Sequence, residues 1–124
     1  MRADREGPIQ RQIVSWLRLV LPEAVVHHAR NEINKRGRAI QIELARAKGK
    51  GAVTGFPDLV VLPWAHVGPM FFEVKAPGGY PSGAQRDLHE RLDGLGYRVA
   101  VVRSVDDVRA ALAAWGVATR EVRG

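Results

Sequence analysis

The chain has 124 residues, a formal net charge of +6 and 46% hydrophobic residues, which suits one compact domain with its own core. It contains no cysteine, which excludes a disulfide framework and a thiolate metal site. It has no apolar run near the roughly 20 residues that a membrane span needs, and its charged N-terminus lacks the apolar stretch of a signal peptide. We therefore expect a soluble, cytoplasmic protein with no membrane partner.

The first half of the chain alternates helical and extended patterns. Apolar residues at helical spacing predict a helix over residues 8–20, which Pro22 ends. The segment 24–29 (AVVHHA) predicts a short strand. Residues 31–37 are polar and basic and predict a loop, whereas residues 38–48 predict a second, short helix.

Two apolar runs occupy the middle of the chain. Residues 59–62 and 70–72 are apolar throughout, which is typical of central strands in a covered sheet. Pro63 and Pro69 bracket the connection between them, which predicts a hairpin with an exposed tip.

The last third predicts helix, strand and helix. Ser82 and Gln85 have the spacing of a capping box, which starts a helix whose buried stripe is expected to include Leu88, Leu92 and Leu95. Residues 97–102 predict a strand.

A last helix is expected to begin at Ser104, followed by a loose tail from Ala118. The element order predicts an α/β fold with a mixed central sheet flanked by helices. We expect a single domain over residues 1–124, with its core at about residues 6–116.

Two acids and a lysine stand at the ends of the two apolar runs. Asp58 precedes the first run, and Glu73 and Lys75 close the second. Residues two apart on a strand project from the same face, so Glu73 and Lys75 are expected together and Val74 on the opposite face. An acid at the end of an apolar strand is costly unless something pairs with it. Two acids and a lysine that meet at one place predict a hard divalent cation held by oxygen ligands, with an ammonium beside it. Such a site can hydrolyse a phosphodiester bond.

Positive charge is concentrated between residues 30 and 50. Seven basic residues and two acids lie there, and they contribute +5 of the net charge of +6. A basic segment next to an acidic metal site fits a polyanionic substrate, and we expect nucleic acid. The candidates for phosphate contacts are Arg38, Arg46, Lys48 and Lys50.

Longer motifs surround the acids and the lysine. They are GFPDL at residues 55–59, FEVKAPGG at 72–79, Ser82 with Gln85, GYRV at 96–99 and VRS at 102–104. With these motifs the chain resembles the VRR-NUC family, the virus-type replication-repair nucleases of the PD-(D/E)xK superfamily, from about residue 52 to 115. The resemblance implies a restriction-endonuclease-like fold. It also implies a stand-alone protein of phage, prophage or bacterial type that acts in the host cell cytoplasm.

The same resemblance assigns roles to the residues. It implies that Asp58 and Glu73, with the backbone carbonyl of Val74, bind Mg²⁺ or Mn²⁺, as one ion or two. Lys75 would position or help to activate the attacking water and offset phosphate charge.

Two helices are expected to add residues to this site. Glu6 resembles the acid of the family's first-helix motif and is expected just before the helix body, because a glycine and a proline follow it. Gln10 is the alternative helix residue. Gln85 faces the active site in the resembling family, and it would also cap its own helix with Ser82.

Other residues have simpler interpretations. His89 lies one helical turn after Gln85 and could reach the same cleft, although an exposed structural histidine is the simpler interpretation. His27 and His28 are adjacent on a strand and face opposite sides, so a zinc site is not expected. Trp64, in a loop, is the tryptophan to consider for base stacking.

We expect a metal-dependent endodeoxyribonuclease acting on branched or structured DNA, four-way junctions among them. The branched substrate and a homodimer come from the resemblance alone, since two sites related by a two-fold axis suit a symmetric junction. Two alternatives stay open. One is the same chemistry with flap, nick or other DNA specificity, and the other is a non-catalytic DNA-binding module with a relict nuclease site.

Overall fold

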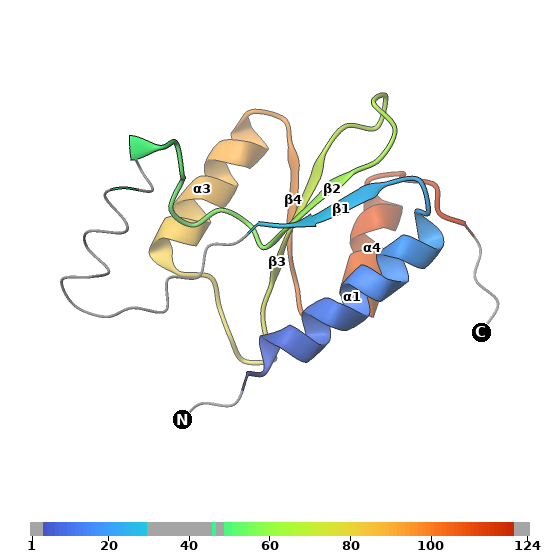
Figure 1. The fold of residues 1–124 in the computed structure, drawn as a ribbon, viewed down its shortest axis with the longest axis horizontal. Helices are drawn as coiled ribbons and strands as arrows, with labels where there is room; N and C mark the ends of the chain where they lie inside the picture. The colour runs from blue at the N-terminus through green and yellow to red at the C-terminus, as the bar shows by residue number, and fades with distance from the viewer. Residues whose placement is uncertain (1–3, 30–45, 47–48, 121–124) are drawn as a thin grey trace.

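A four-stranded sheet carries helices on both faces in the computed structural model, which describes residues 4–29, 46 and 49–120 (Figure 1). The elements in chain order are α1 (Glu6–Val20), β1 (Val25–His28), β2 (Leu59–Leu62), β3 (Met70–Val74), α3 (Gly83–Gly94), β4 (Arg98–Val102) and α4 (Val105–Ala114). The helix predicted over residues 38–48 lies outside the described residues, apart from Arg46, which is helical. Within the described ranges, no helix is long and apolar enough to cross a membrane.

The strands lie in the sheet in the order β1-β2-β3-β4. β1 pairs with β2 and β2 with β3 in antiparallel fashion, and Leu59 lies opposite Phe72. The chain then crosses over through α3 to β4, which pairs with β3 in parallel and sets Val74 opposite Val102. The two apolar runs are thus the central strands β2 and β3, and the predicted hairpin between them is confirmed.

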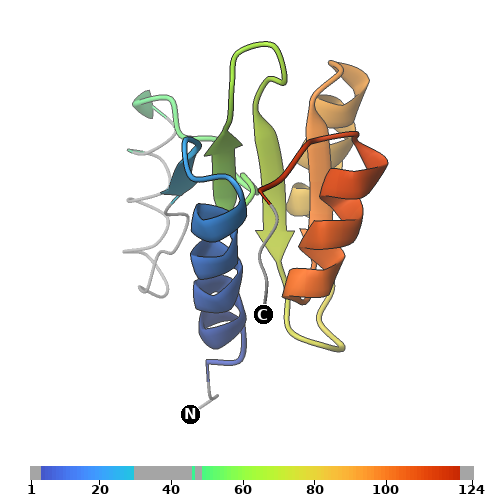
Figure 2. The same ribbon diagram turned by 90° about the vertical axis from the view of Figure 1, so that its right-hand side faces the viewer.

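The helices lie in separate layers. α1 and α4 cover one face of the sheet and α3 covers the other (Figures 1 and 2). The core fills the space under α1 and α4, and its fully buried side chains include Ile13, Leu17, Leu59, Val61, Met70, Phe72, Val74, Val102, Val108 and Leu112. Because side chains alternate along a strand, Val74 enters this core while Glu73 projects toward α3.

Serine side chains start both C-terminal helices, as predicted. Ser82 Oγ accepts a hydrogen bond from Gln85 N at 3.2 Å, and Gln85 Oε1 accepts one from Ser82 N at 2.8 Å, which completes a capping box at α3. Ser104 Oγ accepts from Asp107 N at 3.1 Å at the start of α4. These caps fix where the loop after β3 ends, and therefore where α3 meets the sheet.

The first helix begins earlier than its sequence predicts. α1 starts at Glu6, so Glu6 belongs to its first turn and does not precede it. Asp4 Oδ1 accepts a hydrogen bond from Gly7 N at 2.8 Å, which satisfies one of the free N–H groups of that turn. An acid in the first turn also suits the positive end of the helix dipole.

The buried stripe of α3 is shorter than predicted. Leu88 is buried, but Leu95 is 72% exposed, so its prediction as a core residue is wrong. The helix ends at Gly94, and Leu95 follows the last turn. The apolar spacing of Leu88, Leu92 and Leu95 suggests one helix face. Because the helix ends before Leu95, that face no longer exists at this residue.

The C-terminal segment is more closely attached than predicted. Val117 is buried against the core, and Arg120 N donates a hydrogen bond to Val20 O at 2.7 Å. The described part of the tail therefore lies against the end of α1, and the core extends to Val117.

Candidate active site

Asp58 lies immediately before β2 and reaches across to β3. Its Oδ2 accepts a hydrogen bond from Val74 N at 2.8 Å. The regular pairing of β2 with β3 ends at Leu59 and Phe72, so the carboxylate replaces the next backbone acceptor along the edge of β3. This contact holds the Asp58 carboxylate beside the end of β3.

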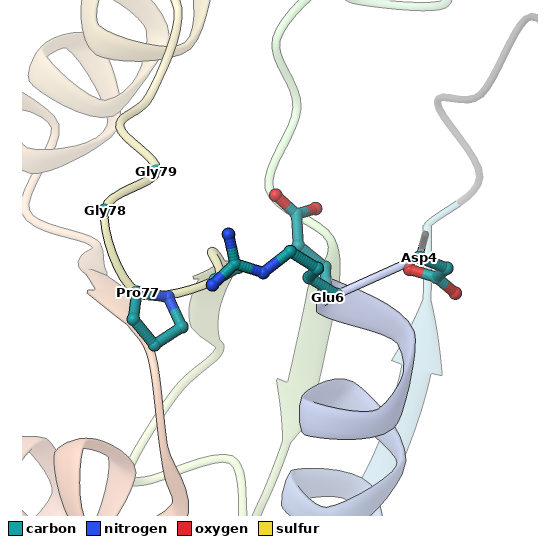
Figure 3. A pocket seen from close by; sticks show the side chains of 7 residues that line it. Asp4, Glu6, Pro77, Gly78 and Gly79 are labelled. Carbon is teal, nitrogen blue, oxygen red and sulfur yellow. The ribbon is translucent and has the colours of Figure 1, made fainter. Parts of the chain in front are cut away.

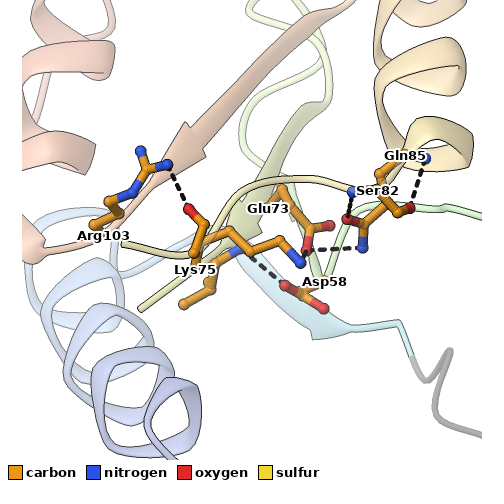
Figure 4. Close-up of polar contacts among 8 residues, drawn as sticks. Asp58, Glu73, Lys75, Ser82, Gln85 and Arg103 are labelled. Carbon is orange, nitrogen blue, oxygen red and sulfur yellow. Dashed lines mark hydrogen bonds and ion pairs between the residues drawn. The ribbon is translucent and has the colours of Figure 1, made fainter. Parts of the chain in front are cut away.

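Glu73 is the acid on the α3 side of that strand, and its residue is only 1% exposed. Its Oε2 lies 3.3 Å from Lys75 Nζ and accepts a hydrogen bond from Gln85 Nε2 at 3.2 Å (Figure 4). Lys75 lies just past the strand and continues its pairing, since Lys75 N donates to Val102 O at 3.0 Å. The structure thus places Glu73 and Lys75 on one side and Val74 on the other.

Gln85 takes part in two contacts at once, because its amide has an acceptor end and a donor end. The oxygen Oε1 caps α3 at Ser82, and the nitrogen Nε2 donates to Glu73. The capping box therefore also fixes the direction in which this amide meets the buried carboxylate. Figure 4 shows Gln85 approaching Glu73 from α3, with Lys75 and Asp58 on the sheet side.

These two contacts of Gln85 can be separated by mutation. We expect both Gln85→Ala and Ser82→Ala to lower the free energy of unfolding by about 1 kcal/mol, because each removes half of the capping box. Only Gln85→Ala also frees Glu73, so we expect it to lower kcat by about 10-fold and Ser82→Ala to change kcat less than about 2-fold. Urea unfolding and single-turnover cleavage measure the two effects. Equal losses of activity in both variants would contradict a role for Gln85 beyond its cap.

The environment of Glu73 disfavours its charge. The pKa of Glu73 is raised from 4.5 to about 8, mainly by burial and also by the nearby Asp58 carboxyl, while the Lys75 ammonium acts in the opposite direction. Glu73 Oε1 is buried without a hydrogen-bond partner among the described residues. A buried carboxylate oxygen that lacks a partner is a polar group that a bound cation would satisfy.

The donor set fits a hard divalent cation. Asp58 and Glu73 supply two carboxyl groups at the same strand end, and the buried Glu73 Oε1 is an open ligand atom. The part of the chain that the structure describes holds no cluster of three or more His, Cys, Asp or Glu suited to a metal. Mg²⁺ keeps several of its waters and needs only one or two carboxylates, whereas Zn²⁺ takes three or four protein ligands.

Glu6 lies across a cavity from the segment that follows Lys75. The cavity has a volume of about 630 Å³ and is lined by Asp4, Arg5, Glu6, Ala76, Pro77, Gly78 and Gly79 (Figure 3). Of the two helix residues considered for the site, Glu6 lines this cavity, while Gln10 lies about one turn further along α1. Among the described residues, Glu6 has no hydrogen bond or ion pair with Asp58 or Glu73, and neither acid lines this cavity.

His89 is partly buried, in contrast to the exposed structural histidine that the sequence suggests. Its Nε2 is buried and has no hydrogen-bond partner among the described residues. Burial lowers the pKa of its imidazole, Lys75 lowers it further, and Asp58 opposes both effects. The ring is therefore within electrostatic reach of Lys75 and Asp58.

Where the structure describes them, the remaining candidates make no hydrogen bond or ion pair with Asp58 or Glu73. Arg46 and Lys50 are exposed, and Arg38 and Lys48 lie outside the described residues. His27 and His28 are both exposed on β1. Trp64 is half-exposed in the β2–β3 connection, at the end of β3 opposite to Lys75, where its ring stacks on His66 with centroids 6.2 Å apart.

Sequence reasoning gave Arg103 no role, yet it contacts the segment that follows Lys75. Its Nη2 donates a hydrogen bond to Gly79 O at 2.7 Å (Figure 4). The two residues are 24 positions apart, and their contact depends on β4 lying beside β3. The signals in the sequence are that Arg103 immediately follows the predicted strand 97–102 and that both residues lie in the longer motifs, VRS and FEVKAPGG.

Comparison with known proteins agrees with this geometry. The model of the VRR-NUC domain family matches residues 3–106. A solved structure described as a VRR_NUC domain protein is 22% identical with a TM-score of 0.68, and the match covers 93% of this chain and 90% of that one. A second, described as a VRR_NUC domain, is 25% identical with a TM-score of 0.61 and coverages of 90% and 97%. No curated protein matches the chain. The chain, with its mixed sheet and its acids and lysine at one strand end, belongs to the VRR-NUC family of nuclease domains and has the restriction-endonuclease-like fold.

Proposed function

We propose that this protein is a Mg²⁺- or Mn²⁺-dependent endodeoxyribonuclease that hydrolyses phosphodiester bonds in branched or structured DNA. The observation that carries the proposal is the meeting of two carboxyl groups and an ammonium at one strand end. Asp58 is held on Val74 N, and Lys75 Nζ lies 3.3 Å from the buried Glu73. Family membership supports nuclease chemistry on DNA.

Each residue has a defined task in this mechanism. Asp58, Glu73 and the carbonyl of Val74 would hold the cation, and Glu73 Oε1 is the ligand atom that has no other partner among the described residues. When bound, the cation would polarise the phosphate and lower the pKa of a water molecule. Gln85 holds Glu73 through Oε2 and leaves Oε1 free to bind.

Lys75 would serve the reacting phosphate directly. Its side chain is 14% exposed, and its ammonium is held beside Glu73. A hydrogen bond from Nζ to the attacking water or to a non-bridging oxygen would place the nucleophile and offset the charge that develops on the phosphate. The water oxygen forms the new bond to phosphorus as the bond to the leaving sugar oxygen breaks.

The choice of DNA rests on charge, size and family resemblance. The net charge of +6 favours a polyanion, and the exposed Arg46 and Lys50 lie in the basic segment. A domain of 124 residues covers little DNA, and a homodimer would place two such sites on a four-way junction. Arg38 and Lys48 complete the proposed set of phosphate contacts.

A panel of labelled DNAs tests this function. Duplex, single strand, flap, nicked, forked and four-way junction DNA are incubated with Mg²⁺ or Mn²⁺ and the wild-type protein, Asp58→Ala or Asp93→Ala. We expect cleavage by the wild type and by Asp93→Ala, strongest on branched DNA, and none by Asp58→Ala. Asp93 is the matched control because it is an exposed aspartate near the end of α3.

The same panel separates the alternatives. If flap or nicked DNA is cleaved most strongly, the metal-dependent nuclease reaction is supported, but the proposed preference for four-way junctions is wrong. DNA binding without metal-dependent cleavage of any substrate would contradict the enzyme and favour a binding module. Light scattering during size-exclusion chromatography tests the homodimer, which a monomer both with and without DNA would contradict.

A further inference from the structure

The segment between β3 and α3 joins two residues of the candidate site, because it starts after Lys75 and ends before Gln85. Gly79 N donates a hydrogen bond to Ala76 O at 2.9 Å, and Gly78 has a φ of 83°, which glycine adopts without strain. A Cβ added to Gly79 would lie 3.1 Å from Ala76 O and 3.9 Å from Lys75 Cβ. The segment is therefore a tight turn whose backbone lies directly beside Lys75.

Arg103 fixes this turn from the neighbouring strand. Its Nη2 donates to Gly79 O at 2.7 Å (Figure 4). Its backbone N donates to Asp107 Oδ2 at 2.8 Å, so it is held at both ends. The guanidinium carbon also lies 5.3 Å from the centroid of the Tyr80 ring. This geometry is a cation–π contact, and it sets the position of the ring next to the turn.

Tyr80 is 76% exposed despite this support. That value is the largest among the large apolar and aromatic residues that the structure describes as exposed. Since Arg103 contacts the ring and most of its surface is open, Tyr80 presents an aromatic plane to solvent, one residue after the glycine that lies beside Lys75. A ring fixed by a cation loses little conformational freedom when a ligand stacks on it.

The ligand that this surface fits is a nucleobase. Every base has a π-face that stacks on an aromatic side chain, and a nearby guanidinium favours the nucleic acid that carries it. A base inside a duplex has both faces covered by its neighbours, so only an unpaired base can offer a face to Tyr80. The cavity beside the turn also contains Arg5, whose charge suits the adjoining phosphate.

We propose that Tyr80, positioned by Arg103, stacks on an unpaired nucleobase next to the scissile phosphate and so selects DNA with unpaired or unstacked nucleotides. This inference rests on the proposed function, because it takes DNA as the substrate of the site that includes Lys75. It adds a specificity residue to the proposed roles of Asp58, Glu73 and Lys75.

A fluorescent base tests the stacking directly. Two duplexes carry 2-aminopurine at one position, either unpaired or paired with thymine, and both are titrated with protein that carries Lys75→Ala, so that binding is measured without cleavage. We expect quenching of the unpaired base on binding. Adding Tyr80→Leu should abolish that quenching and weaken binding of the unpaired duplex by about 10-fold, with little change for the paired duplex. Tyr80→Phe, which keeps the ring, should restore both.

Tyr97→Leu is the matched control, because the chain has two tyrosines and Tyr97 lies at the opposite end of β4. We expect it to leave the quenching and the affinity unchanged. Unchanged quenching and affinity in Tyr80→Leu would overturn the inference, even if the wild type cleaves DNA. Conversely, quenching that depends on Tyr80 in a protein that cleaves no DNA would support this inference and overturn the nuclease function.

Discussion

Replacing Lys75 by alanine is expected to lower kcat for DNA cleavage by about 10³-fold, the scale of losing one charged group that stabilises a developing oxyanion. The ammonium lies 3.3 Å from the buried Glu73, and it is the only lysine among the described residues at this strand end. Its loss removes the group that would place the attacking water and offset phosphate charge. Because the interaction matters most in the transition state, kcat should fall far more than KM rises.

Single-turnover cleavage of an end-labelled substrate, with enzyme in excess, measures this loss without interference from product release. Arg86→Ala is the control for removing a positive charge, because Arg86 is exposed in the first turn of α3. We expect that variant to retain a rate within about 3-fold of the wild type. A Lys75→Ala rate as high as that of Arg86→Ala would contradict the catalytic role of Lys75.

Replacing Glu73 by glutamine is expected to stabilise the metal-free protein at high pH and to abolish its activity. The pKa of Glu73 is raised in the folded protein to about 8 from an ordinary 4.5, because the carboxyl group is buried and lies near Asp58. The neutral carboxyl is compatible with the fold, so its contribution to stability is full below about pH 4.5 and is lost as pH rises through about 8. The loss is on the order of 5 kcal/mol in the free energy of unfolding, from about 3.5 units of pKa at 1.36 kcal/mol for each unit.

Glutamine keeps the shape and an acceptor for Gln85 Nε2, but it does not ionise. Urea unfolding in EDTA, between about pH 5 and about pH 9, should show the wild type losing stability relative to Glu73→Gln as pH rises. Exposed Glu23→Gln is the matched control and should follow the wild type. Parallel curves for the wild type and Glu73→Gln would contradict a buried, charge-disfavouring position for this acid.

The strand pattern made part of the site predictable. Alternation along residues 73–75 predicts that Glu73 and Lys75 share a face, because a period of two is built into any strand. The continuous apolar runs likewise predict central strands, and the structure has β2 and β3 in those positions. The spacing of Ser82 and Gln85 predicts the capping box because both partners lie within one turn.

Contacts between residues on different elements could not be predicted from the sequence pattern, because they depend on how those elements pack. Gln85 meets Glu73 only because the turn after β3 brings α3 back over that strand. Arg103 reaches Gly79 only because β4 pairs with β3 in parallel. Leu95 failed as a core residue for a related reason, since the end of α3 decides its exposure and helical spacing does not.

The dependence of DNA cleavage on Mg²⁺ concentration, compared between the wild type and Asp58→Ala, tests the central claim most directly. The claim is that the two carboxyl groups at the end of β3 hold the cation on which hydrolysis depends. We predict no cleavage by the wild type in EDTA, a rate that rises with Mg²⁺ and then saturates, and no measurable rate for Asp58→Ala at any concentration. Wild-type cleavage that persists in EDTA, or a saturating curve for Asp58→Ala that matches the wild type, would contradict it.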